Sequence, residues 1–153
     1  MSTDEVVFTL VTGMLGRLYL SGFLDRMTPG QLALVREGVQ AHQQIRTEIA
    51  AALPVWPLGL PGWNDPHVAL GLVAPDGSVL LSVWSRSPSD PLLELPWPAY
   101  RGRSVQVEPV FPGGDDAWTW EWDPETAVLT VRATPNAATA RTVRLRFGDS
   151  SPA

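Results

Sequence analysis

Hydrophobic residues between positions 28 and 53 recur at steps of three and four, which is the period of an amphipathic helix. The stripe consists of Leu32, Val35, Val39, His42, Ile45, Ile49 and Leu53. Thr28 and Gln31 have the spacing of a capping box, and Pro29 occupies the first helical position. Pro54 ends the pattern, because proline lacks an amide donor. We therefore predict a long helix between Thr28 and Pro54.

A second helix is predicted before this one, with a strand between the two. Ser2 and Glu5 form another capping-box pair ahead of an apolar segment, and Gly13 is a plausible stop. Met14–Leu20 is apolar apart from a glycine and an arginine, which predicts a short buried strand. The expected order is helix, strand, helix, and the strand would need neighbours in a sheet.

After Pro54 the pattern changes to short alternating segments separated by turn residues, which is typical of strands. The expected strands span residues 67–73, 78–84, 92–95, 105–111, 117–122, 127–133 and 139–147. This number and spacing predicts an antiparallel β-sandwich. The fold class is α+β, with a helical segment at 1–53, a sandwich at 54–148 and a tail at 149–153.

The stretch VVFTLVTGMLGRLYLSGFLDRMTPGQLALVREGVQAHQQIR resembles the last part of the catalytic barrel of melibiase-type α-galactosidases, glycoside hydrolase family 36. The Leu24-Asp25 pair and the helix that ends near Ile45-Arg46 match the family's order of elements. The resemblance implies that residues 1–53 form the end of a β/α barrel and that a C-terminal β-sandwich follows. It also implies a parent enzyme that hydrolyses terminal α-galactosides with retention.

The resemblance places no catalytic residue in this chain. The family's nucleophile follows a lysine in a K-x-D arrangement, and all eleven basic residues here are arginine. The family's acid/base lies in a Trp-x-Ser-Asp context, whereas Ser89-Asp90 follows Trp84 at the wrong spacing and reads as a turn. We therefore expect the chain alone to be inactive. Ser21 follows the predicted strand and is the substrate-side candidate if the barrel interpretation holds; otherwise it is a loop serine.

Alternating tryptophans are the main candidates for sugar binding. Trp118, Trp120 and Trp122 share one strand face, where they could stack on carbohydrate or fill the sandwich core. The core interpretation is favoured, because an exposed row of three indoles would be a costly apolar patch. Three further tryptophans beside prolines or glycines are expected to hold the hinge against the sandwich: Trp56, Trp63 and Trp97.

No metal or cofactor site is predicted. His42 lies on the helical stripe, where a hydrogen-bonded core histidine is the usual case, and His67 has no second histidine at ligand spacing. An acidic cluster lacks the alternating pattern of a calcium loop; it consists of Asp115, Asp116, Glu121, Asp123 and Glu125.

Composition limits the partners. The net charge of −5 argues against nucleic acid and anionic membranes. No apolar run approaches the ~20 residues that span a bilayer. The acidic start lacks the basic residues of a signal peptide, so a cytoplasmic location is expected.

Three functional interpretations remain open. The first is the C-terminal piece of an α-galactosidase-like hydrolase, whose partner is the rest of the barrel or a second copy. The helical surface expected to bind that partner comprises Val6, Phe8, Leu10, Leu32, Val35 and Val39. The second is a non-catalytic carbohydrate-binding or accessory sandwich. The third is a structural domain that docks through its apolar helices.

Overall fold

A computed structural model describes residues 1–22, 24–86, 90–114, 117–134 and 137–150. The helices are α1 (Thr3–Met14) and α2 (Pro29–Ile49), with single 3-10 turns η1 (Leu24–Arg26) and η2 (Pro98–Tyr100). The strands are β1 (Leu53–Val55), β2 (His67–Val73), β3 (Val79–Ser85), β4 (Leu92–Pro96), β5 (Arg103–Phe111), β6 (Thr119–Asp123), β7 (Val128–Arg132) and β8 (Thr139–Ser150). The predicted combination of helices followed by antiparallel sheets is confirmed.

The strands form two antiparallel sheets. The larger sheet has five strands in the order β1-β2-β3-β8-β5, and the smaller has three in the order β4-β7-β6. The β2–β3 hairpin turns at Asp76, whose carboxylate accepts hydrogen bonds from the amide and hydroxyl of Ser78. These bonds hold the pKa of Asp76 below its usual value. β8 lies between β3 and β5, so the last strand of the sequence is interior to the larger sheet.

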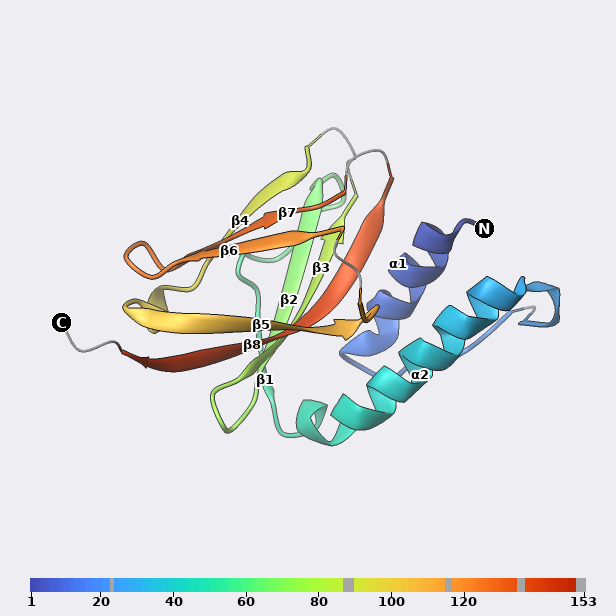
Figure 1. Ribbon diagram of the computed structural model, residues 1–153, viewed down its shortest axis with the longest axis horizontal. Helices are drawn as coiled ribbons and strands as arrows, with labels where there is room; N and C mark the ends of the chain where they lie inside the picture. Colours follow the sequence, from blue (N-terminus) through green and yellow to red (C-terminus); the bar gives the residue numbers. More distant parts are fainter. Residues whose placement is uncertain (23, 87–89, 115–116, 135–136, 151–153) are drawn as a thin grey trace.

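The five-stranded sheet is the middle layer of the molecule, with the helices on one face and the smaller sheet on the other (Figure 1). Successive side chains of β3 point to opposite faces of the five-stranded sheet. Leu80 packs with the helices and Phe111, whereas Val79 and Leu81 pack against β4 and β7. The predicted shared face of Val79, Leu81 and Val83 is confirmed.

Both predicted helix starts are confirmed in atomic detail. Ser2 and Glu5 cap α1 reciprocally, and Thr28 and Gln31 cap α2 in the same way. The long helix ends earlier than the sequence pattern indicated, at Ile49. The next residues turn and enter β1, a short edge strand that pairs with β2 and that the sequence pattern did not predict.

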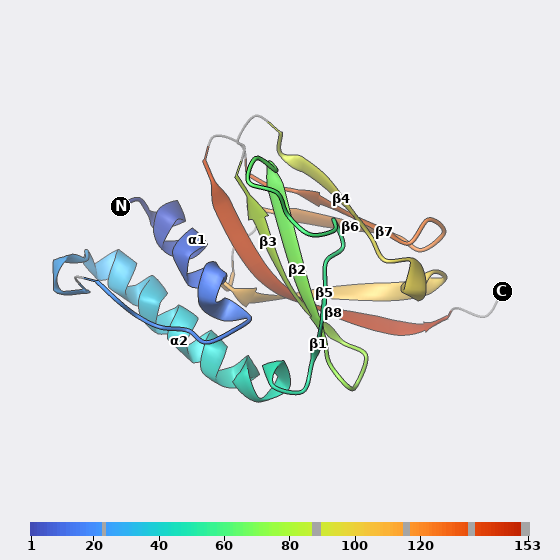
Figure 2. The ribbon, with the colours of Figure 1, turned by 180° about the vertical axis from the view of Figure 1, so that it is seen from behind.

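The predicted strand at Met14–Leu20 is wrong. α1 continues through Met14, and Arg17–Ser21 follows as an extended segment outside any sheet. Figure 2 shows this blue segment running alongside α2 and antiparallel to it. The apolar pattern predicted a buried strand, but no neighbouring strand is present among the described residues to pair with this segment.

The helical segment predicted at 1–53 and the sandwich predicted at 54–148 share one hydrophobic cluster. It combines residues of α1 and α2 with sheet residues, among them Leu72, Leu80, Phe111 and Ala140. The boundary at 53/54 falls inside β1, and β8 extends to Ser150, into the predicted tail. The rest of that tail, 151–153, lies outside the described residues. Neither helix in the described ranges is both long and apolar enough to cross a bilayer.

Candidate functional site

The extended segment Arg17–Ser21 and the two helices enclose a small cavity of about 110 Å³. Ser21 lies at its edge and is itself exposed. The rest of the lining is mainly apolar: Met1, Val6, Thr9, Leu10, Leu18, Tyr19, Leu20, Leu24, Met27 and Val35. This lining holds neither a carboxylate nor an imidazole.

The backbone of this segment is the unusual feature of the region. Among the described residues, Arg17–Ser21 take part in no backbone–backbone hydrogen bond. The preceding residue does form contacts: the Gly16 amide donates to the Gly13 carbonyl at 3.2 Å, and the Gly16 carbonyl lies 2.9 Å from Nε2 of His42. His42 is therefore hydrogen-bonded, as the sequence predicted, but it is half-buried rather than a core residue. Two apolar side chains of the segment face solvent, since Tyr19 is 75% and Leu20 is 43% exposed.

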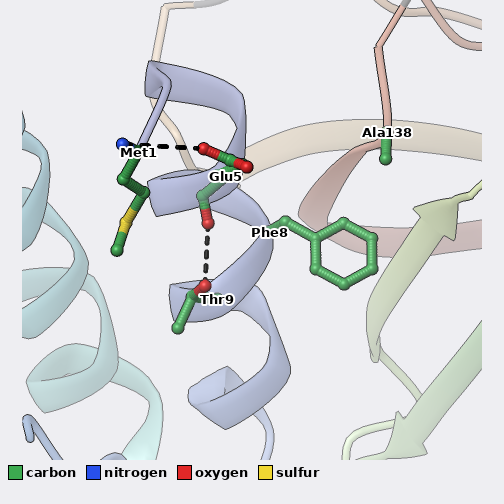
Figure 3. Close-up of a pocket in the computed structure, with 5 residues that line it drawn as sticks. All are labelled: Met1, Glu5, Phe8, Thr9 and Ala138. Carbon is green, nitrogen blue, oxygen red and sulfur yellow. Dashed lines mark hydrogen bonds and ion pairs between the residues drawn. The ribbon is translucent and has the colours of Figure 1, made fainter.

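An open apolar hollow of about 460 Å³ lies beside the first turns of α1 (Figure 3). It is lined by Met1, Glu5, Phe8, Thr9 and Ala138, and the Phe8 ring projects into it. Glu5 is its one carboxylate and is engaged in the helix cap, where the backbone hydrogen bond from Ser2 lowers its pKa. The Thr9 hydroxyl donates to the Glu5 carbonyl at 2.8 Å. This hollow therefore has no free acid or base.

A polar groove between α2 and the β5–β8 pair contains two carboxylates, the number that a retaining glycosidase requires. Each is held by an arginine. Glu48 accepts two hydrogen bonds from Arg144, at 2.7 and 3.0 Å, and Glu108 accepts from Arg146 at 3.0 Å. Both carboxylates are therefore engaged in hydrogen-bonded ion pairs with arginine. The groove is an ion-pair cluster.

The three alternating tryptophans pack inward. Trp118 is buried in the cluster between the two sheets, and Trp120 and Trp122 are partly buried against the same cluster. The Trp118 ring lies under the guanidinium of Arg141 at 5.4 Å, and the Trp122 indole donates to the Arg103 carbonyl at 2.7 Å. The favoured core interpretation therefore describes their packing. No continuous indole platform faces solvent on this strand.

The prediction for Trp63 is wrong. Trp97 is buried between the sheets and Trp56 is 39% exposed, but Trp63 is 92% exposed and holds nothing against the sandwich. It lines a hollow of about 390 Å³ with Pro61, Gly62, Val68 and Arg86, which we call the Trp63 hollow. Sequence analysis missed this site because a tryptophan between glycine and asparagine gives no periodic signal.

The remaining polar candidates form no shared metal site among the described residues, and some of them fall outside the described ranges. His67 is nearly buried, and its Nε2 lies 3.8 Å from the exposed carboxylate of Asp90. Ser89, Asp115 and Asp116 lie outside the described residues. Asp123 accepts from the hydroxyl of Thr126 at 2.7 Å, which lowers its pKa and closes the β6–β7 turn. No group of three potential metal ligands occurs in the described part of the chain.

Half of the helical docking surface predicted from sequence is buried, whereas Leu32 and Val39 are half-buried. Val6, Leu10 and Val35 are at most 7% exposed, because they pack between the helices and the five-stranded sheet. Phe8 is partly buried against the same cluster. A lone helix pair would expose these residues, but here the outer face of the sheet covers them.

Comparison of the chain with protein-family models, curated proteins and solved structures finds no match. Two features of the described residues bear on function: the segment Arg17–Ser21, which has no backbone hydrogen-bond partner there, and the exposed Trp63 beside its hollow.

Proposed function

We propose that this chain is the C-terminal part of an α-galactosidase-like glycoside hydrolase. Its helices and the segment between them would be the end of the barrel, and its sheets the C-terminal β-sandwich. The resemblance of residues 6–46 to that family motivates the proposal. The unpaired state of Arg17–Ser21 is the observation that carries it.

Three properties of this segment support the proposal. It runs as a drawn-out segment in Figure 2, and its mostly exposed residues lack ladder partners within the described residues, so its backbone is open to pairing with another strand. It runs antiparallel to α2, which is the relation between a strand and the helix that follows it in a β/α unit (Figure 2). Tyr19 and Leu20 are exposed apolar residues, and in a β/α barrel the helix layer and the barrel interior would cover the two faces of such a strand.

The proposal assigns catalysis to residues outside this sequence. The groove that holds Glu48 and Glu108 has the required number of carboxylates, but both are paired with arginine. Purified chain should therefore show no turnover of a chromogenic α-galactoside above a heat-denatured control. Turnover that disappears on Glu48→Gln or Glu108→Gln substitution would contradict this assignment.

The parentage can be tested in the source cells. An antibody raised against the chain should precipitate a larger polypeptide together with α-galactosidase activity. Pre-incubation of the antibody with purified chain is the control and should abolish recovery of both. Recovery of a polypeptide of 16.6 kDa alone, without activity, would reject the proposal.

A further inference from the structure

The Trp63 side chain is displayed on a loop that is held in place. Residues 56–66 connect β1 to β2 and include three prolines, each of which restricts its own backbone. The Gly62 amide donates to Oδ2 of Asp65 at 2.7 Å, and Nη2 of Arg86 donates to the Trp63 carbonyl at 2.7 Å. The Arg86 amide also donates to the Pro66 carbonyl at 2.7 Å. The indole is thus carried by an ordered loop at almost complete exposure.

The exposure of Trp63 is not shared by the other tryptophans, because the interior of the sandwich accommodates indoles. Trp97 and Trp118 are at most 5% exposed, and the other tryptophans are partly buried or, at Trp56, 39% exposed. An isolated exposed leucine needs no explanation, but an indole at the edge of a hollow offers a large rigid apolar surface to a ligand. Pre-organisation by the loop lowers the entropy that binding would cost.

Arg86 supplies the polar part of the Trp63 hollow. It is the one ionisable residue in the lining, and the other members are Pro61, Gly62, Trp63 and Val68. Its guanidinium has five N–H donors, and the bond to the Trp63 carbonyl is its one side-chain hydrogen bond to a described residue. The remaining donors form a planar fork that suits oxygen acceptors.

Together these groups define a ligand with two properties. It must have a flat apolar face that lies on the indole, and it must carry oxygen acceptors at its edge for the Arg86 guanidinium. A pyranose ring has both, because its axial C–H groups form an apolar face and its hydroxyl and ring oxygens lie at the edge. Nucleic acid has bases that stack and phosphates that bind arginine, but the chain's net charge of −5 opposes it.

We propose that the Trp63 hollow is a saccharide-binding site, in which a sugar ring stacks on Trp63 and its oxygens accept hydrogen bonds from Arg86. The site lies on the β1–β2 loop and is distinct from the buried Trp118–Trp120–Trp122 row. It does not depend on the proposed barrel, since none of its residues belongs to the segment at 1–53. A single open site of this kind should have a dissociation constant of about 1 mM.

The test is an NMR titration of the full 15N-labelled chain with methyl glycosides of galactose, glucose and mannose, and with methyl galacturonoside. The indole N–H signal of Trp63, assigned by its loss in Trp63→Ala, should shift saturably with at least one sugar. Tighter binding of the galacturonoside than of the galactoside would indicate that Arg86 binds a carboxylate. Equal binding would indicate that it binds hydroxyls, and both results support the site.

Variants distinguish specific binding in the Trp63 hollow from nonspecific binding to the loop. Trp63→Ala should weaken binding about ten-fold or more, as judged from backbone amides of Val68 and Arg86, and Arg86→Gln should also weaken it. Leu60→Ala is the matched control, because Leu60 is 79% exposed on the same loop but does not line the hollow. Absence of any Trp63 shift at about 50 mM sugar, far above the expected dissociation constant, would overturn the proposal. Equal losses in Trp63→Ala and Leu60→Ala would also overturn it.

Discussion

Gly71 shows how closely the residues of the sandwich interior approach one another. A methyl group at this position would lie 2.8 Å from Cγ1 of Val55, 3.1 Å from Cη2 of Trp97 and 3.2 Å from Cγ1 of Val79. Gly71→Ala should therefore lower the free energy of unfolding by about 1–3 kcal/mol, through overpacking. Urea denaturation measures this change.

Gly30→Ala is the control for that substitution. Gly30 is exposed in the first turn of α2, and an added methyl group would meet nothing within 4 Å. Its stability should be unchanged or slightly higher, because alanine favours the helix. A Gly71→Ala protein as stable as the parent chain would show that the interior at β2 can expand.

At the scale of residues, sequence reasoning succeeded where a repeating pattern existed. The alternation of Trp118, Trp120 and Trp122 identified a strand face, and burial was the less costly interpretation of that face. It failed for Trp63, because loop residues have no repeating pattern from which the burial or exposure of an indole could be predicted. The hydrogen bond from Arg86 to the Trp63 carbonyl joins β3's end to a distant loop, so it has no local sequence signature.

The segment Arg17–Ser21 gives a prediction at the scale of elements. Its amides have no backbone partner among the described residues, so in the isolated chain they should exchange with solvent at close to unstructured rates. Amides in the middle of α2 are the internal control and should be strongly protected. Native-state hydrogen exchange measured by NMR resolves the two. Strong protection of Arg17–Ser21 in a monomeric chain would contradict the unpaired description.

Element types were predictable where an element carried its own signals. The capping boxes marked both helix starts, and the seven predicted strands correspond to β2 through β8. The error at Met14–Leu20 had a different cause. Apolar extended sequence becomes a strand only when a neighbour is available, and that condition is a property of the surroundings. β1 was missed because three residues around Pro54 are too few to show alternation.

The whole molecule should unfold as one unit. One hydrophobic cluster joins α1 and α2 to the five-stranded sheet, and the Glu48–Arg144 pair links α2 to β8. Thermal unfolding followed by far-ultraviolet circular dichroism, which reports the helices, should coincide with unfolding followed by tryptophan fluorescence. All seven tryptophans lie outside α1 and α2, and one of them, Trp84, contacts α1 through its indole N–H, which donates to the Thr12 hydroxyl at 3.3 Å. A helical transition at lower temperature would contradict the single unit.

The interior position of β8 also constrains how the chain is made. β3 and β5 are neighbours in the finished sheet only through β8, which is the last strand to be synthesised. Until residues 139–150 leave the ribosome, one edge of β3 and one edge of β5 stay open, and the sheet that the helices cover is incomplete. Folding of this region must therefore follow translation of its final strand. Between the synthesis of β3 and that of β8 the nascent chain carries unpaired strand edges, and binding by chaperones would protect it most in this interval.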